Sequence, residues 1–155
     1  MSEFSVRPAN PDDAPGISAC VREAYVHYIE RIGRQPGPML EDYAEVIQQA
    51  QVHVAIGDGK VVGAIVLKVT DEGFYIDNVS VIPSVKGKGI GRALLELAEA
   101  EARLQNYNSI YLATHELMTE NRALYYGIGY SEYDHRVVSG YPRVFFRKSL
   151  LSTRL

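Results

Sequence analysis

Residues 74–104, FYIDNVSVIPSVKGKGIGRALLELAEAEARL, are the stretch that decides the fold. The segment begins as an extended apolar run, turns at a proline and continues as a leucine-rich helical pattern. Between the two, Gly87, Gly89 and Gly91 fall on alternate residues, so the backbone there can approach a ligand without obstruction from Cβ atoms. The first N–H groups of the helix have no intrahelical partner and carry the positive end of the peptide dipoles. This arrangement predicts a site for an anion such as a pyrophosphate.

Three basic residues add positive charge around these glycines: Lys86, Lys88 and Arg92. The spacing is not that of the common nucleotide loops. A P-loop needs GxxxxGK followed by Ser or Thr, which the sequence lacks, and a GxGxxG dinucleotide fingerprint would need a glycine in place of Arg92. Taken alone, a tight strand-to-helix turn without a ligand is nearly as good an interpretation of the loop.

The loop resembles the acyl-CoA signature of the GNAT N-acetyltransferase superfamily, in which a strand is followed by Gln or Arg, two residues, Gly, one residue, and Gly or Ala. Lys86 stands where the family usually has Gln or Arg, but the main-chain N–H of that position is the group expected to bind phosphate. A second stretch, NRALYYGIGY at 121–130, resembles another family signature, an Asn four residues before a Tyr on a helix that ends in a Gly-aromatic pair. Val81 and Pro83 also match the family pattern, so the resemblance covers essentially the whole chain.

The resemblance implies that acetyl-CoA is the acetyl donor and that no metal takes part. It places the pyrophosphate on loop residues 86–92, with Asn121 also holding the cofactor. The pantetheine arm is expected to align like an added strand along the main chain near Val79 and Val81, whose side chains can still belong to the core. The cofactor-binding residues that the resemblance implies are Val79, Val81, Lys86, Gly87, Lys88, Gly89, Gly91, Arg92 and Asn121.

Tyr125 is the residue that the resemblance assigns to the departing CoA sulfur, as a donor of a proton or a hydrogen bond. Asn121 and Tyr125 are four residues apart and share one helical face, whereas Tyr126 points about 100° further around the helix. Spacing alone favours a different interpretation, in which Tyr125 is one of eleven tyrosines packing a core. The neighbouring glycine loop favours the catalytic one. Because tyrosine has a pKa of about 10 and a thiol about 8.5, a hydrogen bond to the developing thiolate matters more than complete proton transfer.

Transfer to an amine also requires a base, because an amine of pKa about 10.4 is mostly protonated at neutral pH. Asp77, a carboxylate within a central strand, is our catalytic candidate, since burying it is costly unless it is paired or faces a cleft. His115 and Glu116, just after the strand that begins at Ile110, are the alternatives. Each of the three, taken singly, is more often a structural residue.

The acceptor site is expected between the first two helices and the final hairpin. Its candidate residues are Tyr25, Tyr28, Arg31, Arg34, Met39 and 139–141. Arg31 and Arg34 could clamp a substrate carboxylate, but such arginines are more often a solvated helix end. Cys20, on an apolar helical stripe, is a poor nucleophile candidate. We expect His27 and His53 to be exposed or half-exposed, and His135 to point outward from a strand.

Length and composition set the class of protein. The 155 residues predict a single domain, 1–155, that can bury its own core. A net charge of -3 argues against nucleic-acid binding, and no apolar window reaches the length of a membrane span. The N-terminus lacks a basic segment followed by an apolar run, and the single cysteine excludes an internal disulfide, so we expect a soluble cytoplasmic protein. The sequence is compatible with a homodimer.

Periodicity predicts the remaining elements. A strand at 4–7 leads to a helix that Asn10 begins, with an apolar stripe at 17, 20, 21, 24 and 28, and that Gly33 ends. A shorter helical pattern passes through Leu40, Tyr43, Val46 and Ile47, and an antiparallel meander follows from strands at 52–56, 61–69 and 74–82. The long helix carries Ile90, Leu94, Leu97 and Leu104 on one face and Glu99 and Arg103 on a more exposed one, and a left-handed residue at Asn106 or Asn108 ends it. A strand from Ile110 parallel to 74–82, a helix from Thr119 or Glu120 that Gly127 and Gly129 break, and a hairpin of 130–138 and 141–149 complete the chain.

These elements predict an α/β fold like that of GNAT acyl-CoA N-acyltransferases. The central sheet is mostly antiparallel, with a parallel pair splayed at the cofactor site and helices on both faces. The expected function is acetyl transfer from acetyl-CoA to a primary amine of a small molecule or peptide, by direct attack in a ternary complex. A non-catalytic acyl-CoA-binding or sensing module is the alternative.

Overall fold

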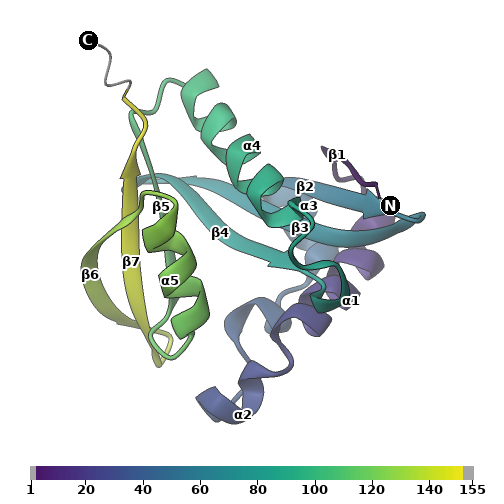
Figure 1. Ribbon diagram of the computed structural model, residues 1–155, viewed down its shortest axis with the longest axis horizontal. Coiled ribbons are helices and arrows are strands. Elements are labelled where there is room, and N and C mark those ends of the chain that lie inside the picture. Colours follow the sequence, from purple (N-terminus) through teal and green to yellow (C-terminus); the bar gives the residue numbers. More distant parts are fainter. Residues whose placement is uncertain (1–2, 152–155) are drawn as a thin grey trace.

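The computed structural model describes residues 3–151, which form one seven-stranded mixed sheet with helices on both faces (Figure 1). The strands are β1 (Ser5–Pro8), β2 (Gln51–Gly57), β3 (Lys60–Thr70), β4 (Gly73–Val81), β5 (Ser109–His115), β6 (Ser131–Val138) and β7 (Tyr141–Ser149). Their order in the sheet is β1-β2-β3-β4-β5-β7-β6, and every neighbouring pair is antiparallel except β4 and β5. The expected fold class is confirmed.

Helices cover the two faces of this sheet. The α-helices are α1 (Ala14–Tyr25), α2 (Tyr28–Ile32), α3 (Tyr43–Gln49), α4 (Ile90–Leu104) and α5 (Thr119–Gly127), and the 3-10 turns are η1 (Pro11–Asp13), η2 (Gly37–Leu40) and η3 (Pro83–Val85). One apolar core joins α1 and α3 to the sheet, and the other joins α4 and α5 to the opposite face (Figure 1). No helix in the described part of the chain is long and apolar enough to cross a membrane.

The parallel pair is short, and this opens the sheet. β4 and β5 are in register only at Phe74 with Ile110, Tyr75 with Tyr111, and Ile76 with Leu112. Beyond that point the two strands separate, and Figure 1 shows the two halves of the sheet diverging between them. The far end of β4 is therefore paired only on its β3 side.

A β-bulge at Asp77 changes which face of the sheet the side chains of β4 occupy. The residues on either side, Ile76 and Asn78, pair with adjacent residues of β3, so Asp77 has no direct partner in the register. Ile76 belongs to the core under α4, and Val79 packs against that same core, although strict alternation would place the two on opposite faces. Asn78 instead bonds to residues of α1 and α3.

The predicted start of the first helix is confirmed. Asn10 caps η1, its side chain accepting from the Asp12 N–H at 3.0 Å, while the Asp13 carboxylate accepts from the Asn10 N–H at 2.8 Å. Asp13 also pairs with Arg7 through two hydrogen bonds of 2.8 and 3.0 Å. This reciprocal capping fixes how α1 leaves the edge strand β1.

Several predictions about the helices needed correction. The stripe ending at Tyr28 is buried as expected, but a break at residues 26–27 divides it between α1 and α2. Leu40 lies outside α3 in a 3-10 turn and is 62% exposed, because Asp42 caps the helix only from Tyr43 onward.

The buried stripe of α4 also differs from the one predicted. Leu104 is 75% exposed, and the inward positions are taken by alanines, Ala98 and Ala102, which allow the helix to lie close to the sheet. Glu99 is not on an exposed face with Arg103, since it forms an ion pair of 2.9 Å with Lys148 of β7. The left-handed residue after the helix is Asn106, with φ of 69°.

His53 is the one histidine whose predicted exposure is wrong. It is 7% exposed because it lies on the central strand β2, between β1 and β3, whereas His27 and His135 are exposed as expected. Burial lowers the pKa of His53, and nearby Glu101 partly offsets this shift. Its Nδ1 atom has no hydrogen-bond partner within residues 3–151.

Candidate active site

The glycine loop forms the start of α4. Gly87 and Gly89 have φ of 85° and 89°, in the left-handed region that favours glycine, and Gly89 is the residue that precedes the first helical position. A Cβ atom built on either one would meet nothing within 4 Å. The space beside these two residues is thus open to a ligand, and the unbonded N–H groups of the first helical turn lie next to it.

A groove of about 970 Å³ runs along this loop. Of the predicted cofactor-binding residues, six line it: Val81, Lys86, Gly87, Gly89, Gly91 and Arg92. The opposite wall comes from Leu124 of α5, from Gly129 just after that helix, and from Lys148 of β7. We call this hollow the donor groove. Its dimensions, open glycines and basic rim suit a long, anionic ligand such as CoA.

Three of the predicted cofactor residues lie elsewhere. Lys88 borders a separate hollow together with Phe4 and Lys60, on the outer side of the loop. Val79 and Asn121 line a second cavity, described below, rather than the groove.

The main chain of β4 is open at the point where the sheet splays. The Ile82 N–H donates to the Val62 carbonyl of β3 at 3.0 Å. Because successive residues of an antiparallel strand direct their main-chain groups to opposite sides, those of Val79 and Val81 point away from β3, toward the opening. An extended ligand at this edge could therefore pair with β4 as an added strand.

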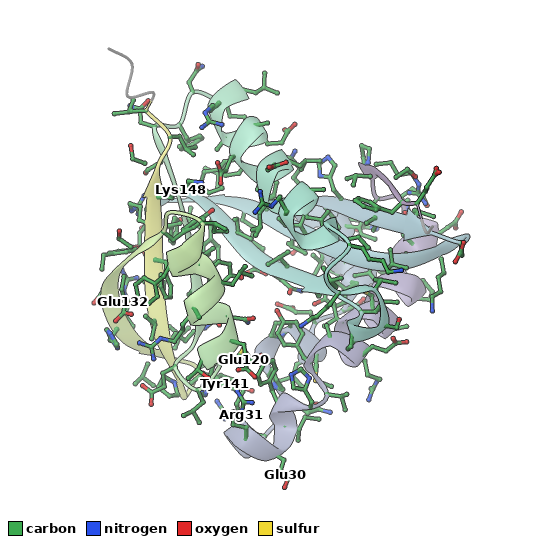
Figure 2. All side chains as sticks on the ribbon, viewed as in Figure 1. Glu30, Arg31, Glu120, Glu132, Tyr141 and Lys148 are labelled. Carbon is green, nitrogen blue, oxygen red and sulfur yellow. The ribbon has the colours of Figure 1, made fainter. Side chains whose placement is uncertain are left out.

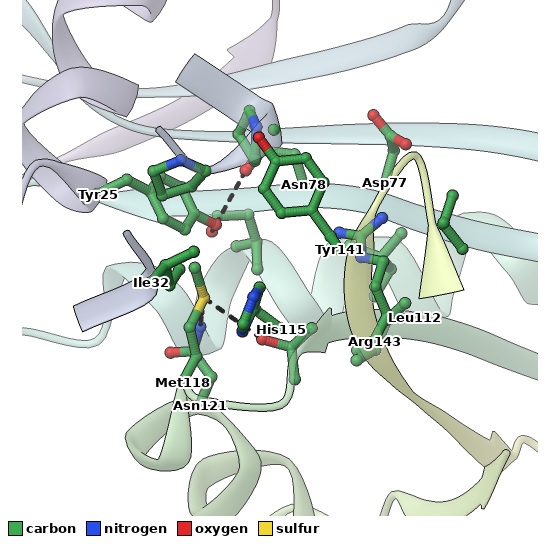
Figure 3. A pocket seen from close by; sticks show the side chains of 18 of the residues that line it. Tyr25, Ile32, Asp77, Asn78, Leu112, His115, Met118, Asn121, Tyr141 and Arg143 are labelled. Carbon is green, nitrogen blue, oxygen red and sulfur yellow. Dashed lines mark hydrogen bonds between the residues drawn. The ribbon is translucent and has the colours of Figure 1, made fainter. Parts of the chain in front are cut away.

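The second cavity, which we call the acceptor cavity, lies on the other side of the opening and measures about 220 Å³ (Figure 3). It is lined by segments that are far apart in the sequence: α1, the end of α2, the loop before α3, the bulge of β4, the end of β5, α5 and the β6–β7 turn. The residues that carry its chemistry are Tyr25, Glu41, Asp77, Asn78, His115, Asn121, Tyr125 and Arg143.

Asn121 and Tyr125 both face the acceptor cavity, as their spacing predicts, and Tyr126 does not. Tyr126 is 50% exposed and donates its hydroxyl hydrogen bond to Glu132 on the outside of the molecule. Tyr125 is buried, its ring 5.8 Å from that of Phe146, and its hydroxyl has no hydrogen-bond partner within residues 3–151. Burial raises the pKa of Tyr125, so the hydroxyl stays protonated and available as a donor.

The three candidate bases are placed very differently. Asp77 lines the cavity, half-buried on its bulge, with Lys68 3.6 Å away. Glu116 is exposed and does not line the cavity. His115 does line it, but its Nδ1 accepts from the Leu117 N–H at 3.1 Å, which leaves the proton of the neutral ring on Nε2. In that tautomer Nε2 is a donor and not a base, so the geometry favours Asp77.

A buried hydrogen-bond network forms the wall beside Asp77. The Tyr25 hydroxyl lies 3.2 Å from Asn78 Oδ1 and 3.1 Å from the Val79 carbonyl, and Asn78 Nδ2 donates to the Tyr43 hydroxyl at 2.9 Å. Tyr43 in turn donates to the Pro38 carbonyl at 2.6 Å. The network ties α1, α3 and the loop before α3 to the bulge, so it fixes the cavity wall. Tyr43 and Asn78 were missed by the sequence analysis, because only the bulge turns Asn78 toward α1.

Contacts between the two halves of the molecule cover the cavity. Arg31 of α2 pairs with Glu120 of α5 at 2.6 Å, and both residues are labelled in Figure 2. The guanidinium of Arg34 stacks 3.5 Å from the Tyr141 ring centre and donates to the Ser139 carbonyl at 2.8 Å. Of the predicted acceptor residues, Tyr25, Ser139 and Tyr141 line the cavity, whereas Tyr28, Arg31, Arg34 and Met39 do not. Arg31 and Arg34, the two arginines predicted as candidates to bind a substrate carboxylate, thus bind residues of the protein that cover the cavity.

Two further groups bear on the chemistry. Burial raises the pKa of Cys20 to about 11, which agrees with its being a poor nucleophile. Within residues 3–151, no three or more His, Cys, Asp or Glu side chains gather in a way that could hold a metal ion.

A family model described as the acetyltransferase (GNAT) family matches residues 19–130, and no curated protein matches the sequence. Among solved structures, an acetyltransferase of the GNAT family from Staphylococcus aureus Mu50 is similar at 18% identity, with 96% of this chain and 100% of that chain covered and a TM-score of 0.76.

Two other structures are similar to the same degree. The PaiA N-acetyltransferase from Thermoplasma acidophilum, in complex with coenzyme A, has 17% identity and a TM-score of 0.77, with 95% of this chain and 99% of that chain covered. The ribosomal-protein-S18-alanine N-acetyltransferase from Escherichia coli has 16% identity and a TM-score of 0.75, with 99% of each chain covered. At such identities the likeness shows the fold alone.

Proposed function

The chain belongs to the acetyltransferase (GNAT) family, and on that premise we propose that it transfers an acetyl group from acetyl-CoA to a primary amine by direct attack in a ternary complex. The observation that supports this most is that two unlike hollows both border the splayed end of β4, with Val79 lining one and Val81 the other. The donor groove has open glycines and basic residues, and the acceptor cavity has a half-buried carboxylate and a buried tyrosine. A coenzyme A complex of the same fold, that of the PaiA N-acetyltransferase, supports the choice of donor.

The donor groove fits CoA by its chemistry. The main-chain N–H groups between residues 86 and 92 would bind the pyrophosphate, with Lys86 and Arg92 adding charge. The main chain at Val79 and Val81 would bind the pantetheine arm. When bound, acetyl-CoA supplies a thioester whose C–S bond is exchanged for a C–N bond to the amine.

The protein's residues would contribute positioning and proton control. Asp77 would accept a proton from the acceptor ammonium, directly or through water. It lines the cavity and has carboxylate oxygens that can accept, whereas His115 presents an Nε2–H donor there. Tyr125 would donate a hydrogen bond to the sulfur as negative charge develops on it. Burial raises the pKa of Tyr125 further above that of a thiol, so we assign it a hydrogen bond and not complete transfer of its proton.

The test is amine-dependent release of thiol from acetyl-CoA by the purified protein, over amines, polyamines, amino acids and peptides. We expect release above the rate of hydrolysis with at least one class of amine. A non-catalytic acyl-CoA-binding or sensing module would bind CoA, raising the melting temperature by mass action, but would release no thiol with any amine. That result would replace the proposal with the alternative.

A further inference from the structure

Arg143 is a half-buried cation in the wall of the acceptor cavity. Within residues 3–151, no carboxylate lies within 4.0 Å of its guanidinium, and the group makes no hydrogen bond. Arg147, four residues further along β7, differs: it donates to Ser109 Oγ at 2.8 Å and to the Glu72 carbonyl at 3.1 Å, outside both hollows. A guanidinium has five donors and is always charged, so leaving it half-buried without a partner is costly unless a ligand supplies one.

The charge of Arg143 acts on residues of three neighbouring elements, α1, β4 and β5. Burial raises the pKa of Tyr25, and it raises that of Tyr75 to about 12, while the nearby charge of Arg143 opposes both shifts. Burial lowers the pKa of His115, and Arg143 adds to that shift after the opposing effect of Glu116. The guanidinium therefore lies between β4, β5 and α1, inside the cavity mouth, and Figure 3 shows it beside Tyr141 and below Asp77.

His115 adds a second donor beside it. His115 and Arg143 are direct partners in the β5–β7 register. Because the Leu117 N–H occupies Nδ1 of His115, its Nε2–H is the group left to bind a ligand. A guanidinium and an N–H donor side by side are suited to the two oxygens of a carboxylate.

The cavity also has anionic residues. Asp77 and Glu41 both line it, and both raise the pKa of Tyr43, next to burial as the main cause. Figure 3 shows Asp77 on the same side of the cavity as Arg143. Apolar side chains line other parts of the cavity, among them Ile32, Leu112 and Met118.

We propose that the acceptor is a free amino acid of small or medium size, with its carboxylate bound by Arg143 and His115 and its amine directed to Asp77. This inference rests on the proposed function and narrows its substrate class. A cavity of about 220 Å³ is below the range of roughly 300–1,000 Å³ that is usual for drug-sized ligands, which favours an acceptor of this size. It also gives Arg143 the role that Arg31 and Arg34, held by Glu120 and Ser139, are not available to play.

The experiment compares three matched acceptors: L-leucine, L-leucinamide and 3-methylbutylamine, which share the apolar part and differ in the carboxylate. Thiol release is measured as a function of acceptor concentration for the wild type and for Arg143→Gln, Arg143→Lys and Arg147→Gln. We expect Arg143→Gln to raise KM for leucine by roughly 10- to 100-fold, the loss typical of a charge-assisted hydrogen-bonded pair, and to change KM for the two amines without a carboxylate less than about threefold. Comparing variant with wild type for each acceptor cancels the different basicities of the three amines.

Arg147→Gln is the control for removing an arginine from the same strand, and it should leave all three acceptors unchanged. Arg143→Lys should recover part of the loss for leucine, because it keeps the charge but not the planar fork. Heat of CoA binding to each variant reports whether it is folded. Two results would overturn the inference and leave the proposed function standing. One is an equal change of KM for leucine and for leucinamide in Arg143→Gln. The other is acetylation of O-phosphoethanolamine and of amines without a carboxylate, but of no amino acid. Absence of thiol release with every amine would overturn both.

Discussion

The donor groove and the acceptor cavity both border the splayed end of β4, yet different kinds of residues line them. One wall of the groove comes from a continuous stretch, residues 81–92, whose glycines leave space beside the backbone. The acceptor cavity is lined by seven separate segments, with charges of both signs and a buried network of tyrosines and Asn78. A site made of backbone can bind the same donor through many sequences, whereas a site made of side chains can change its acceptor with single substitutions.

Tyr125→Phe should have the largest effect, because Tyr125 lines the acceptor cavity and its hydroxyl is the proposed hydrogen-bond donor to the CoA sulfur. We expect turnover to fall by about 10² or more with little change in CoA affinity, since the hydroxyl acts on charge that develops during the reaction. Thiol-release kinetics and CoA calorimetry measure the two quantities. Tyr126→Phe, one residue along and outside both hollows, should leave turnover unchanged. An unaltered rate in Tyr125→Phe would remove this residue from the mechanism.

Gly89→Ala tests whether the groove depends on open backbone. The substitution places a methyl group in the space beside the loop and forces a left-handed conformation that costs roughly 1–2 kcal/mol in a residue with a side chain. We expect CoA affinity to fall about tenfold or more. Gly59→Ala, at φ of 77° in the β2–β3 turn with open space around it, has the same backbone cost and no contact with the groove. Equal CoA affinities of the two variants would contradict the role of the loop.

Asn78→Ala tests the side-chain wall of the acceptor cavity. The change removes the amide that joins Tyr25 to Tyr43, and we expect the free energy of unfolding to fall by about 1–3 kcal/mol. Urea unfolding measures this loss, and Asn108→Ala, an exposed asparagine, should change stability by less than about 0.5 kcal/mol. Acceptor KM should rise while CoA affinity stays constant. A matching loss of CoA affinity would show that the two sites are not built independently.

Asp13→Asn is expected to have the smallest effect and to touch neither site. The hydrogen bonds from Arg7 are the main cause that lowers the pKa of Asp13 below its ordinary value. Burial opposes this shift by a smaller amount than Arg7 produces, and the hydrogen bond from the Asn10 N–H lowers the pKa further. A lowered pKa in the folded state adds stability above the unfolded pKa of about 3.9, and this stability is lost as the pH falls toward the folded value. The wild type should therefore be more stable than Asp13→Asn at neutral pH, with a difference that shrinks in acid. A stability difference between the two proteins that does not change with pH would contradict the pairing of Asp13 with Arg7. CoA affinity and the rate of thiol release should be the same in both.

The sequence predicted the fold and the glycine loop before α4 well because both depend on local patterns. The glycines at 87, 89 and 91, the strand before them and the helix after them are contiguous, so periodicity and spacing suffice. The face of α4 was less well predicted, since Ala98 and Ala102 replace larger apolar residues at the inward positions.

The acceptor cavity was predicted only in outline. Asn78 faces α1 because of the bulge at Asp77, which no local pattern in the sequence marks. Arg143 becomes a binding residue because Arg31 and Arg34 are occupied by partners about 90 to 105 residues away in the chain. The signal that could have found it is the alternation of β7 itself, which places Tyr141 and Arg143 on one face beside the predicted acceptor turn.

Calorimetry with CoA and with pantetheine, which lacks the diphosphate, tests most directly whether main-chain amides between residues 86 and 92 hold the donor. The account predicts saturable binding of one CoA per chain and binding of pantetheine that is weaker by about tenfold or more. No heat with CoA, or equal affinity for the two ligands, would contradict it.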